Sequence, residues 1–179
     1  MWVIAIALAF FLWGQTAMAA PAASLVQAAG LRAMDEPRPA AEFELPSLNG
    51  QVLRLQDQRG KVVLLNFWAT WCPPCVQEMP LLDQLSQALR QQPFVVWAVA
   101  LKEGRDKVAP FMDTHRLQLP ALLDVDGAVS AHYGVRGLPM TYLIDCHGNV
   151  VAQAIGPREW TGEAVRTLLT ALLSEPACR

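Results

Sequence analysis

Residues 61–75, KVVLLNFWATWCPPC, constrain the fold of this chain more than any other stretch. Residues 61–69 are almost continuously apolar, which predicts a strand buried on both faces of a sheet. Cys72 and Cys75 follow directly, with two prolines between them. Proline is tolerated in the first turn of a helix, because the amides of that turn have no intrahelical partner to lose. The stretch therefore predicts a buried strand that leads into a helix, with Cys72 at the N-terminal cap.

Strands and helices alternate along most of the remaining chain. Apolar runs predict strands at 61–69, 94–101, 119–124, 141–145 and 150–154. Apolar residues at helical spacing predict helices at 72–91, 104–117, 126–134 and 159–173. Pro110 is expected to interrupt the second of these helices. This order, which finishes in a strand hairpin, predicts an α/β fold whose mixed central sheet carries helices on both faces.

Residues 43–55, FELPSLNGQVLRL, predict a β-hairpin ahead of this sheet. Asn49 and Gly50 lie between two short apolar stretches. An Asn-Gly pair favours the tight turns that join antiparallel strands, because both residues tolerate positive φ.

The N-terminus is strongly apolar and predicts export. Residues 2–13 form an apolar block, and 17–19, Ala-Met-Ala, fit the small-x-small pattern of a signal-peptidase site, with cleavage before Ala20. The block is shorter than the roughly twenty residues that span a bilayer as a helix, but apolar residues continue beyond it. A cleaved signal peptide at 1–19 and an uncleaved membrane anchor therefore both stay open.

One domain is expected after this segment. Residues 20–37 are rich in Ala and Pro and are interpreted as a linker, part of which, 25–34, could be a short helix. Residues 38–179 suit a single domain with a sizeable core. The 14 Lys and Arg residues nearly balance the 16 Asp and Glu residues without a basic run, so no nucleic-acid partner is expected.

The spacing of Cys72 and Cys75 favours redox chemistry over two structural alternatives. A disulfide that closes so short a loop removes little entropy from the unfolded chain. A zinc site would need a second Cys or His pair at metal spacing, whereas Cys146 and His147 are adjacent. At a helix N-terminus, Cys72 would face unpaired N–H groups, which favour the nucleophilic thiolate. We interpret the pair as a reversible dithiol and expect neither a metal nor a cofactor.

Glu78 lies three residues after Cys75, so both side chains can project from the same face of the helix. A buried carboxylate there would take up and return the proton that Cys75 loses during exchange. The alternative is that Glu78 only complements the helix dipole. Pro80 is expected to kink the same helix.

Two motifs together resemble a known superfamily. NFWATWCPPC followed by VRGLPMTYLID resembles the thioredoxin-fold superfamily, whose members pair a CxxC with a distant cis-proline. More narrowly, KVVLLNFWATWCPPCVQEMP is similar to the TlpA/ResA/CcmG group of exported thiol-disulfide oxidoreductases. The resemblance covers about residues 38–173. It implies a thioredoxin-like fold with an N-terminal β-hairpin and a central helix–strand insertion near 104–123.

The resemblance also implies roles for individual residues. Cys72 would be the attacking cysteine, Cys75 the resolving cysteine and Glu78 the acid coupled to them, while Pro139 would be the cis-proline. Thioredoxin has a buried Asp at the position of Asn66, which cannot titrate. The acid role would therefore pass to Glu78.

A substrate-binding surface is implied around the same motifs. The backbone at Leu138 and Pro139 would offer an edge to which a substrate peptide adds as a strand. Trp71 and Pro73 would lie beside it, and Trp68 would flank the site or pack in the core.

By this resemblance, the chain is expected to reduce disulfides of exported proteins in the periplasm, either as a soluble protein or anchored in the inner membrane. Its electron donor would be a membrane thiol carrier of the DsbD/CcdA kind. One candidate client is the haem-attachment CxxCH of an apocytochrome c.

Three alternatives use the same thiols differently. A disulfide oxidase or isomerase would work at another potential, and Pro-Pro between the cysteines lacks the His that helps a strong oxidant. A thiol peroxidase would need Thr three residues before its cysteine, where Ala69 stands. A copper-binding module would need a wider cysteine spacing and a dedicated His.

Cys146 and Cys178 are expected to form a second, structural disulfide, because exported proteins favour disulfides. The strand at 150–154 runs away from Cys146 for about 17–20 Å. A helix at 159–173 covers about 22 Å in returning, so it ends near the hairpin turn. The alternative is two free thiols, with Cys178 on a frayed tail.

Overall fold

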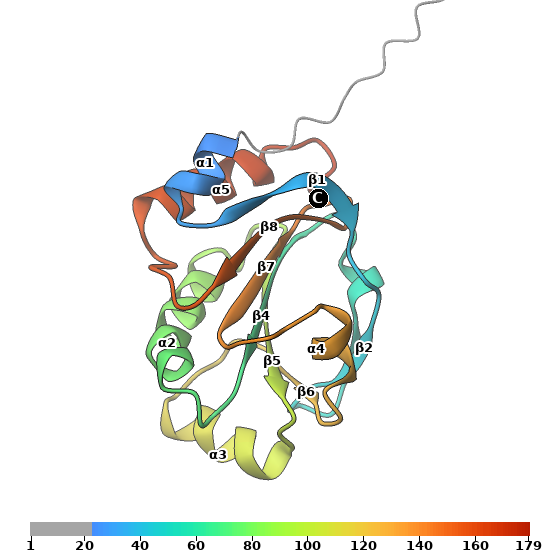
Figure 1. Ribbon diagram of the computed structural model, residues 1–179, viewed down its shortest axis with the longest axis vertical. Coiled ribbons are helices and arrows are strands. Elements are labelled where there is room, and N and C mark those ends of the chain that lie inside the picture. The colour runs from blue at the N-terminus through green and yellow to red at the C-terminus, as the bar shows by residue number, and fades with distance from the viewer. Residues whose placement is uncertain (1–22) are drawn as a thin grey trace, which may run out of the picture.

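A six-stranded mixed sheet forms the centre of the described part of the chain, residues 23–179, in the computed structural model (Figure 1). Its order is β1-β8-β7-β4-β5-β6. The strands are β1 (Arg32–Pro39), β4 (Val62–Trp68), β5 (Phe94–Leu101), β6 (Ala121–Asp124), β7 (Met140–Ile144) and β8 (Asn149–Ile155). Strands β4, β5 and β6 run parallel, whereas β7 is antiparallel to β4, β8 to β7 and β1 to β8. The predicted α/β class with a mixed sheet is confirmed.

Helices cover both faces of this sheet. They are α1 (Ala23–Ala28), the 3-10 helix η1 (Leu55–Gln58), α2 (Pro73–Ala88), α3 (Arg105–Thr114), α4 (Ala128–His132) and α5 (Glu163–Leu173). The core on one face includes buried residues of α1, α2, α3 and α5. The core on the other face contains residues of η1, α4 and the small sheet of β2 (Glu44–Pro46) and β3 (Val52–Arg54). The expected hairpin and the helix–strand insertion of α3 and β6 are both present.

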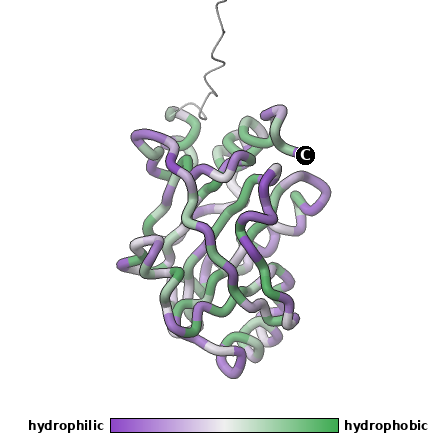
Figure 2. Tube along the Cα trace, turned by 90° about the vertical axis from the view of Figure 1, so that its right-hand side faces the viewer, coloured by the Kyte–Doolittle hydropathy of each residue, from purple (hydrophilic) through white to green (hydrophobic). Residues whose placement is uncertain are grey.

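Strand β4 separates the two cores, and every one of its residues is buried. Its side chains alternate as strand geometry requires: Leu64 packs into the core beneath α2, whereas Leu65 and Phe67 pack into the core beneath α4. Figure 2 shows the same pattern along the chain, with hydrophobic segments in the central strands and hydrophilic segments mostly in the outer loops. The continuous apolar run in the sequence is therefore explained by burial on both faces.

The interpretation of 20–37 as a linker is wrong for its described residues. Residues 23–28 form α1, which packs against α5 and buries Val26 completely, and 32–39 form β1, which pairs with β8. The charged residues of β1 are exposed because an edge strand is held by its backbone ladder, not by burial. The Ala- and Pro-rich composition of this segment is typical of a linker, although its residues form a helix and an edge strand.

The expected interruption at Pro110 is also wrong, since α3 runs through this residue. A proline inside a helix removes one backbone hydrogen bond. Val108 and Met112 are buried on the core side of α3, and Phe111 packs on Trp68 with ring centroids 4.9 Å apart. These contacts offset the lost bond.

The predicted signal peptide or anchor at 1–19 lies outside the described residues. Among residues 23–179, none of the helices combines the length and the apolar character that a membrane crossing requires.

Replacing Val26 tests whether α1 belongs to the folded domain. Val26→Ala should lower the free energy of unfolding by about 2 kcal/mol, because it removes buried methyl groups and leaves a cavity. The exposed neighbour Gln27 is the control, and Gln27→Ala should change the free energy of unfolding by less than about 0.5 kcal/mol. Urea unfolding measures both; equal effects would mean that α1 does not pack as described.

Candidate active site

The loop between β4 and α2 carries the first cysteine. Strand β4 ends at Trp68, and Cys72 caps α2 in an extended conformation, with φ −97° and ψ 101°. Pro73 and Pro74 occupy the first two helical positions, as the sequence predicts. The Val76 N–H donates to the Cys72 carbonyl at 3.0 Å, which closes the first turn. Cys72 therefore lies at the positive end of the α2 dipole.

Cys72 and Cys75 are joined in a disulfide, with their Cα atoms 5.3 Å apart. Cys72 is 4% exposed and Cys75 is fully buried, so Cys72 is the more accessible sulfur. Trp71 is 67% exposed beside it, whereas Trp68 is completely buried. Trp68 thus packs in the core, and only Trp71 of these two is available to a partner.

The peptide bond between Leu138 and Pro139 is cis. Strand β7 begins at the next residue, Met140, which pairs with Phe67 near the end of β4. Pro139 therefore lies at the end of the sheet where β4 leads to the cysteines. The Gly156 N–H donates to the Pro139 carbonyl at 2.8 Å and fixes the segment to β8.

Glu78 is buried, with 1% of its surface exposed, and receives three hydrogen bonds. Asn66 Nδ2 donates to Oε1 at 2.8 Å. Trp160 Nε1 and the Arg158 backbone N–H donate to Oε2 at 3.0 and 3.2 Å. Asn66 Nδ2 also donates to Thr141 Oγ1 at 3.0 Å, so the carboxylate is connected to β4, β7 and the segment after β8.

Burial raises the pKa of the Glu78 carboxyl above 4.5, because the charged form loses its hydration. The hydrogen bonds from Trp160, Asn66 and Arg158 oppose this shift without cancelling it. A carboxyl with a raised pKa can exchange a proton nearer to neutral pH than an exposed glutamate. Glu78 lies on α2 three residues after Cys75, slightly less than one helical turn.

Cys146 and Cys178 lie at the other end of the sheet. Their Cα atoms are 5.3 Å apart and the two residues are joined by a disulfide. Strand β7, which runs from Met140 to Ile144, separates this bond from Pro139 by about 17 Å. The structure therefore brings Cys72, Cys75, Glu78 and the Leu138–Pro139 segment to one region and leaves the second cysteine pair apart.

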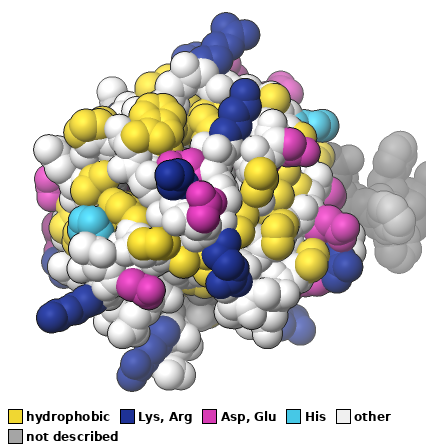
Figure 3. Space-filling view, turned by 90° about the horizontal axis from the view of Figure 1, so that it is seen from below, with side chains coloured by type: hydrophobic (Ala, Val, Ile, Leu, Met, Phe, Trp, Pro, Cys, Tyr) yellow, Lys and Arg dark blue, Asp and Glu magenta, His cyan; other side chains and the backbone are white. Residues whose placement is uncertain are grey.

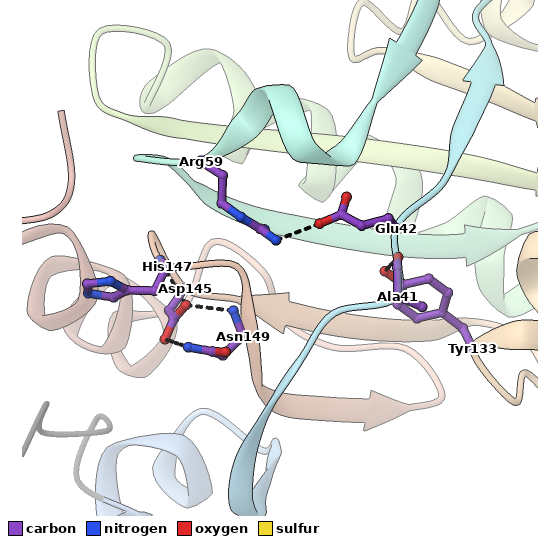
Figure 4. A network of polar contacts seen from close by, with 7 residues as sticks. All are labelled: Ala41, Glu42, Arg59, Tyr133, Asp145, His147 and Asn149. Atoms are coloured by element: carbon purple, nitrogen blue, oxygen red, sulfur yellow. Dashed lines mark hydrogen bonds and ion pairs between the residues drawn. The ribbon is translucent and has the colours of Figure 1, made fainter.

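Polar contacts close this second end of the molecule (Figure 4). Asp145 accepts N–H groups from His147 and Asn149 at 3.0 and 2.8 Å, which shapes the β7–β8 turn. Arg59 and Glu42 form an exposed ion pair at 2.5 Å. The Arg179 N–H donates to the Gly60 carbonyl at 2.8 Å, so the C-terminus is held against the loop before β4.

Sequence reasoning missed Trp160, Arg158, Thr70 and Glu103. Trp160 and Arg158 follow β8 and reach Glu78 across 82 and 80 positions of sequence. Glu103 follows β5 and accepts hydrogen bonds from Thr70, which lies two residues before Cys72. One signal was available, because residues that follow parallel strands gather at the same edge of the sheet. No cluster of three His, Cys, Asp or Glu side chains within residues 23–179 is arranged to hold a metal ion.

Comparison with known proteins identifies the family of this chain. The AhpC/TSA family matches residues 37–153, which include both Cys72 and Cys75. The chain belongs to this family. The thiol-disulfide oxidoreductase ResA of Bacillus subtilis is 37% identical over 128 residues, 72% of each chain. The thioredoxin-like protein YneN of the same organism is 40% identical over 117 residues, 64% of this chain and 68% of that protein.

A solved structure has the same fold. It is described as a thiol:disulfide interchange protein DsbE from Chlorobium tepidum and is 34% identical, with a TM-score of 0.72. The match covers 79% of this chain and 99% of that one. The predicted thioredoxin-like fold and the resemblance to the TlpA/ResA/CcmG group are confirmed. This member of the AhpC/TSA family is a thiol-disulfide oxidoreductase of the ResA and DsbE type.

The raised pKa of Glu78 predicts a pH-dependent stability. The folded oxidised protein keeps the Glu78 proton to higher pH than the unfolded chain, so its free energy of unfolding should fall as pH rises from about 4.5 through the raised pKa. Glu78→Gln should remove this decline, and the variant should gain stability relative to the wild type between pH 4 and pH 8. Urea unfolding at each pH measures the difference.

Glu159, an exposed glutamate close to Trp160, is the matched control. Glu159→Gln should leave the pH profile of stability unchanged. Parallel profiles for the wild type and Glu78→Gln would show that Glu78 does not titrate in this range.

Proposed function

We propose that this oxidoreductase works as a reductant of protein disulfides in exported proteins, with Cys72 as the attacking thiol. The observation that carries the proposal is the asymmetry of the cysteine pair. Cys72 caps a helix at the edge of solvent, whereas Cys75 is buried within one helical turn of a carboxyl whose pKa is raised. This arrangement suits an accessible nucleophile and a protected resolving thiol.

The proposed reaction starts from the reduced dithiol. The Cys72 thiolate attacks one sulfur of the client disulfide, forms a mixed disulfide and releases the first client thiolate. Glu78 takes the proton of Cys75, whose thiolate then attacks Cys72 Sγ and displaces the second client thiolate. The two client thiolates gain the two protons that the enzyme thiols lose. Two electrons pass to the client, and the Cys72–Cys75 disulfide remains.

The proposed client-binding surface lies around the cysteines. Leu138 lies outside the helices and strands, and its backbone forms no hydrogen bond with the backbone of another described residue. In this proposal, its N–H and carbonyl groups pair with a client peptide that adds as a strand. Trp71, Val125 and Ile155 are exposed large apolar residues at the ends of β4, β6 and β8 on this side of the sheet. Figure 3 views the molecule from the end where α3 lies and shows apolar side chains interspersed with charged ones. Pro73 is exposed next to Cys72 and completes the surface.

Export supplies the compartment in this proposal. The apolar segment at 1–19 is the proposed signal peptide, with an inner-membrane anchor as its alternative, and the domain would act in the periplasm. The proposed electron donor is a membrane thiol carrier of the DsbD/CcdA kind, and an apocytochrome c is one proposed client.

Mass spectrometry of the exported protein tests the proposed cleavage. It should find Ala20 at the N-terminus. An intact Met1 in a membrane fraction would contradict cleavage and support the membrane anchor instead.

Two cysteine variants test the assigned order of attack. Cys72→Ser should abolish reduction of insulin disulfides, because no accessible thiolate remains. Cys75→Ser should accumulate mixed disulfides with clients, because attack proceeds without resolution. Normal turnover by Cys75→Ser, measured by insulin precipitation, would contradict the assignment.

The direction of electron flow is tested by the reduction potential of Cys72–Cys75 against glutathione mixtures. A value near that of thioredoxin, about −270 mV, supports a reductant. A value near about −120 mV, typical of a strong periplasmic oxidant, would favour the oxidase alternative instead.

We also propose that Cys146–Cys178 is a structural disulfide. The cysteines are 32 positions apart, so the bond should stabilise the protein by roughly 3 to 4 kcal/mol through the entropy of the unfolded chain. The double variant Cys146→Ser and Cys178→Ser should lose about this free energy of unfolding yet still reduce insulin below its unfolding temperature. Tryptic mapping that finds both peptides unlinked and alkylatable in the oxidised wild type would reject the bond.

A further inference from the structure

Glu103 is a buried carboxylate beneath the loop that carries Cys72. It lies after β5, is 7% exposed and accepts two hydrogen bonds from one residue, Thr70. The Thr70 N–H donates to Oε2 at 2.7 Å, and the Thr70 hydroxyl donates to Oε1 at 2.6 Å. Within the described residues, Glu103 forms no ion pair. Each oxygen of the buried carboxylate therefore depends on Thr70 for its hydrogen bond.

The sheet register brings these two residues together. Strands β4 and β5 are parallel, and Trp68 pairs with Ala100 at their carboxyl ends. Thr70 lies two residues after Trp68, and Glu103 lies three residues after Ala100. The two loops therefore leave the sheet side by side, and the hydrogen bonds join them directly before Trp71 and Cys72.

The backbone before Glu103 adopts a conformation that side chains seldom take. Lys102 has φ 56°, in the left-handed region, which is unfavourable for residues other than glycine. The Lys102 N–H donates to the Asp124 carbonyl at 2.9 Å, so the turn is anchored to the end of β6. Such a conformation persists where surrounding contacts fix it, and it clusters at functional sites.

We propose that Glu103 is a positioning residue for thiol-disulfide exchange, acting through Thr70 on the loop that presents Trp71 and Cys72. The inference rests on the proposed role of Cys72 as the attacking thiol. The loop before Cys72 is held by the Cys72 N–H, which donates to the Ala69 carbonyl at 3.2 Å, and by Thr70, whose hydrogen bonds to Glu103 tie the loop to the end of β5. Loss of the anchor moves Cys72 Sγ away from the N–H groups of α2 and from its line of attack on a client.

Substitutions of Glu103 and Thr70 can separate the effect of the hydrogen bonds from the effect of the negative charge. In Glu103→Gln, the amide oxygen can accept the Thr70 N–H while the amide N–H donates to the Thr70 hydroxyl, so both bonds are preserved without the charge. In Glu103→Ala both bonds are lost. In Thr70→Val the hydroxyl bond is lost and the backbone bond remains.

The experiment measures the rate of Cys72 alkylation by iodoacetamide as a function of pH in the reduced protein, with mass spectrometry to identify the modified cysteine. Glu103→Ala should slow alkylation of Cys72 at neutral pH by at least about fivefold, with a raised apparent pKa of the thiol. Thr70→Val should slow it by about twofold or more, and Glu103→Gln should stay within about twofold of the wild type. Insulin reduction should follow the same order.

Asp83 provides the matched control. It is also 7% exposed and accepts two loop N–H groups, from Gln118 and Leu119 at 2.7 and 2.8 Å, away from the cysteine loop. Asp83→Ala should lower the melting temperature without slowing the alkylation of Cys72.

The possible results distinguish the positioning role of Glu103 from the proposed role of Cys72 as the attacking thiol. If Asp83→Ala and Glu103→Ala slow alkylation equally, or if Glu103→Gln fails as Glu103→Ala does, positioning through Thr70 is overturned. If Glu103→Ala does not fold, Thr70→Val decides, and an unchanged rate in that variant overturns the inference. Preferential alkylation of Cys75 in the wild type would instead overturn the proposed order of attack, and the inference with it.

Discussion

The burial of β4 on both faces is the constraint on which the site depends. Because every residue of this strand lies in a core, its pairing with β5 and β7 cannot shift by one residue without exchanging the two cores. The fixed register brings the end of β4, the end of β5 and the start of β7 to one edge of the sheet. Cys72, Glu103 and Pro139 are neighbours in the fold for this reason, although they are far apart in sequence.

Glu78 shows how the same framework holds a group that burial disfavours. The carboxylate loses its hydration, which raises its pKa, and three donors from β4 and the segment after β8 recover part of that loss. The net effect is a raised pKa, so Glu78 changes charge nearer to neutral pH than an exposed glutamate, three residues along α2 from the buried Cys75. The proposed proton exchange between Glu78 and Cys75 depends on this raised pKa.

The sequence predicted the features that depend on local chemistry. The apolar run of β4, the prolines after Cys72 and the Asn49-Gly50 turn each specify their own conformation, and the mixed sheet followed from their order. The short helix considered at 25–34 overlaps α1, which ends at Ala28, but β1 was not predicted, because an exposed edge strand has no apolar periodicity. The sequence did not predict that Trp160 reaches Glu78 or that Glu103 holds Thr70, because these contacts join residues 82 and 33 positions apart. Contacts between residues so far apart in sequence depend on the register of the strands, which the pattern of apolar and polar residues does not specify.

The two disulfides differ in what they contribute to the folded state. The loop closed by Cys72–Cys75 spans three positions, so its effect on the unfolded chain is worth only about 2 kcal/mol, against almost 4 kcal/mol for a separation of 32. Opening the first bond is therefore expected to lower the free energy of unfolding comparatively little. The second bond lies at the opposite end of the sheet, beyond the reach of the Cys72 thiolate. Under the proposed function, the first disulfide opens and closes during turnover while the second keeps the C-terminal segment attached to the sheet.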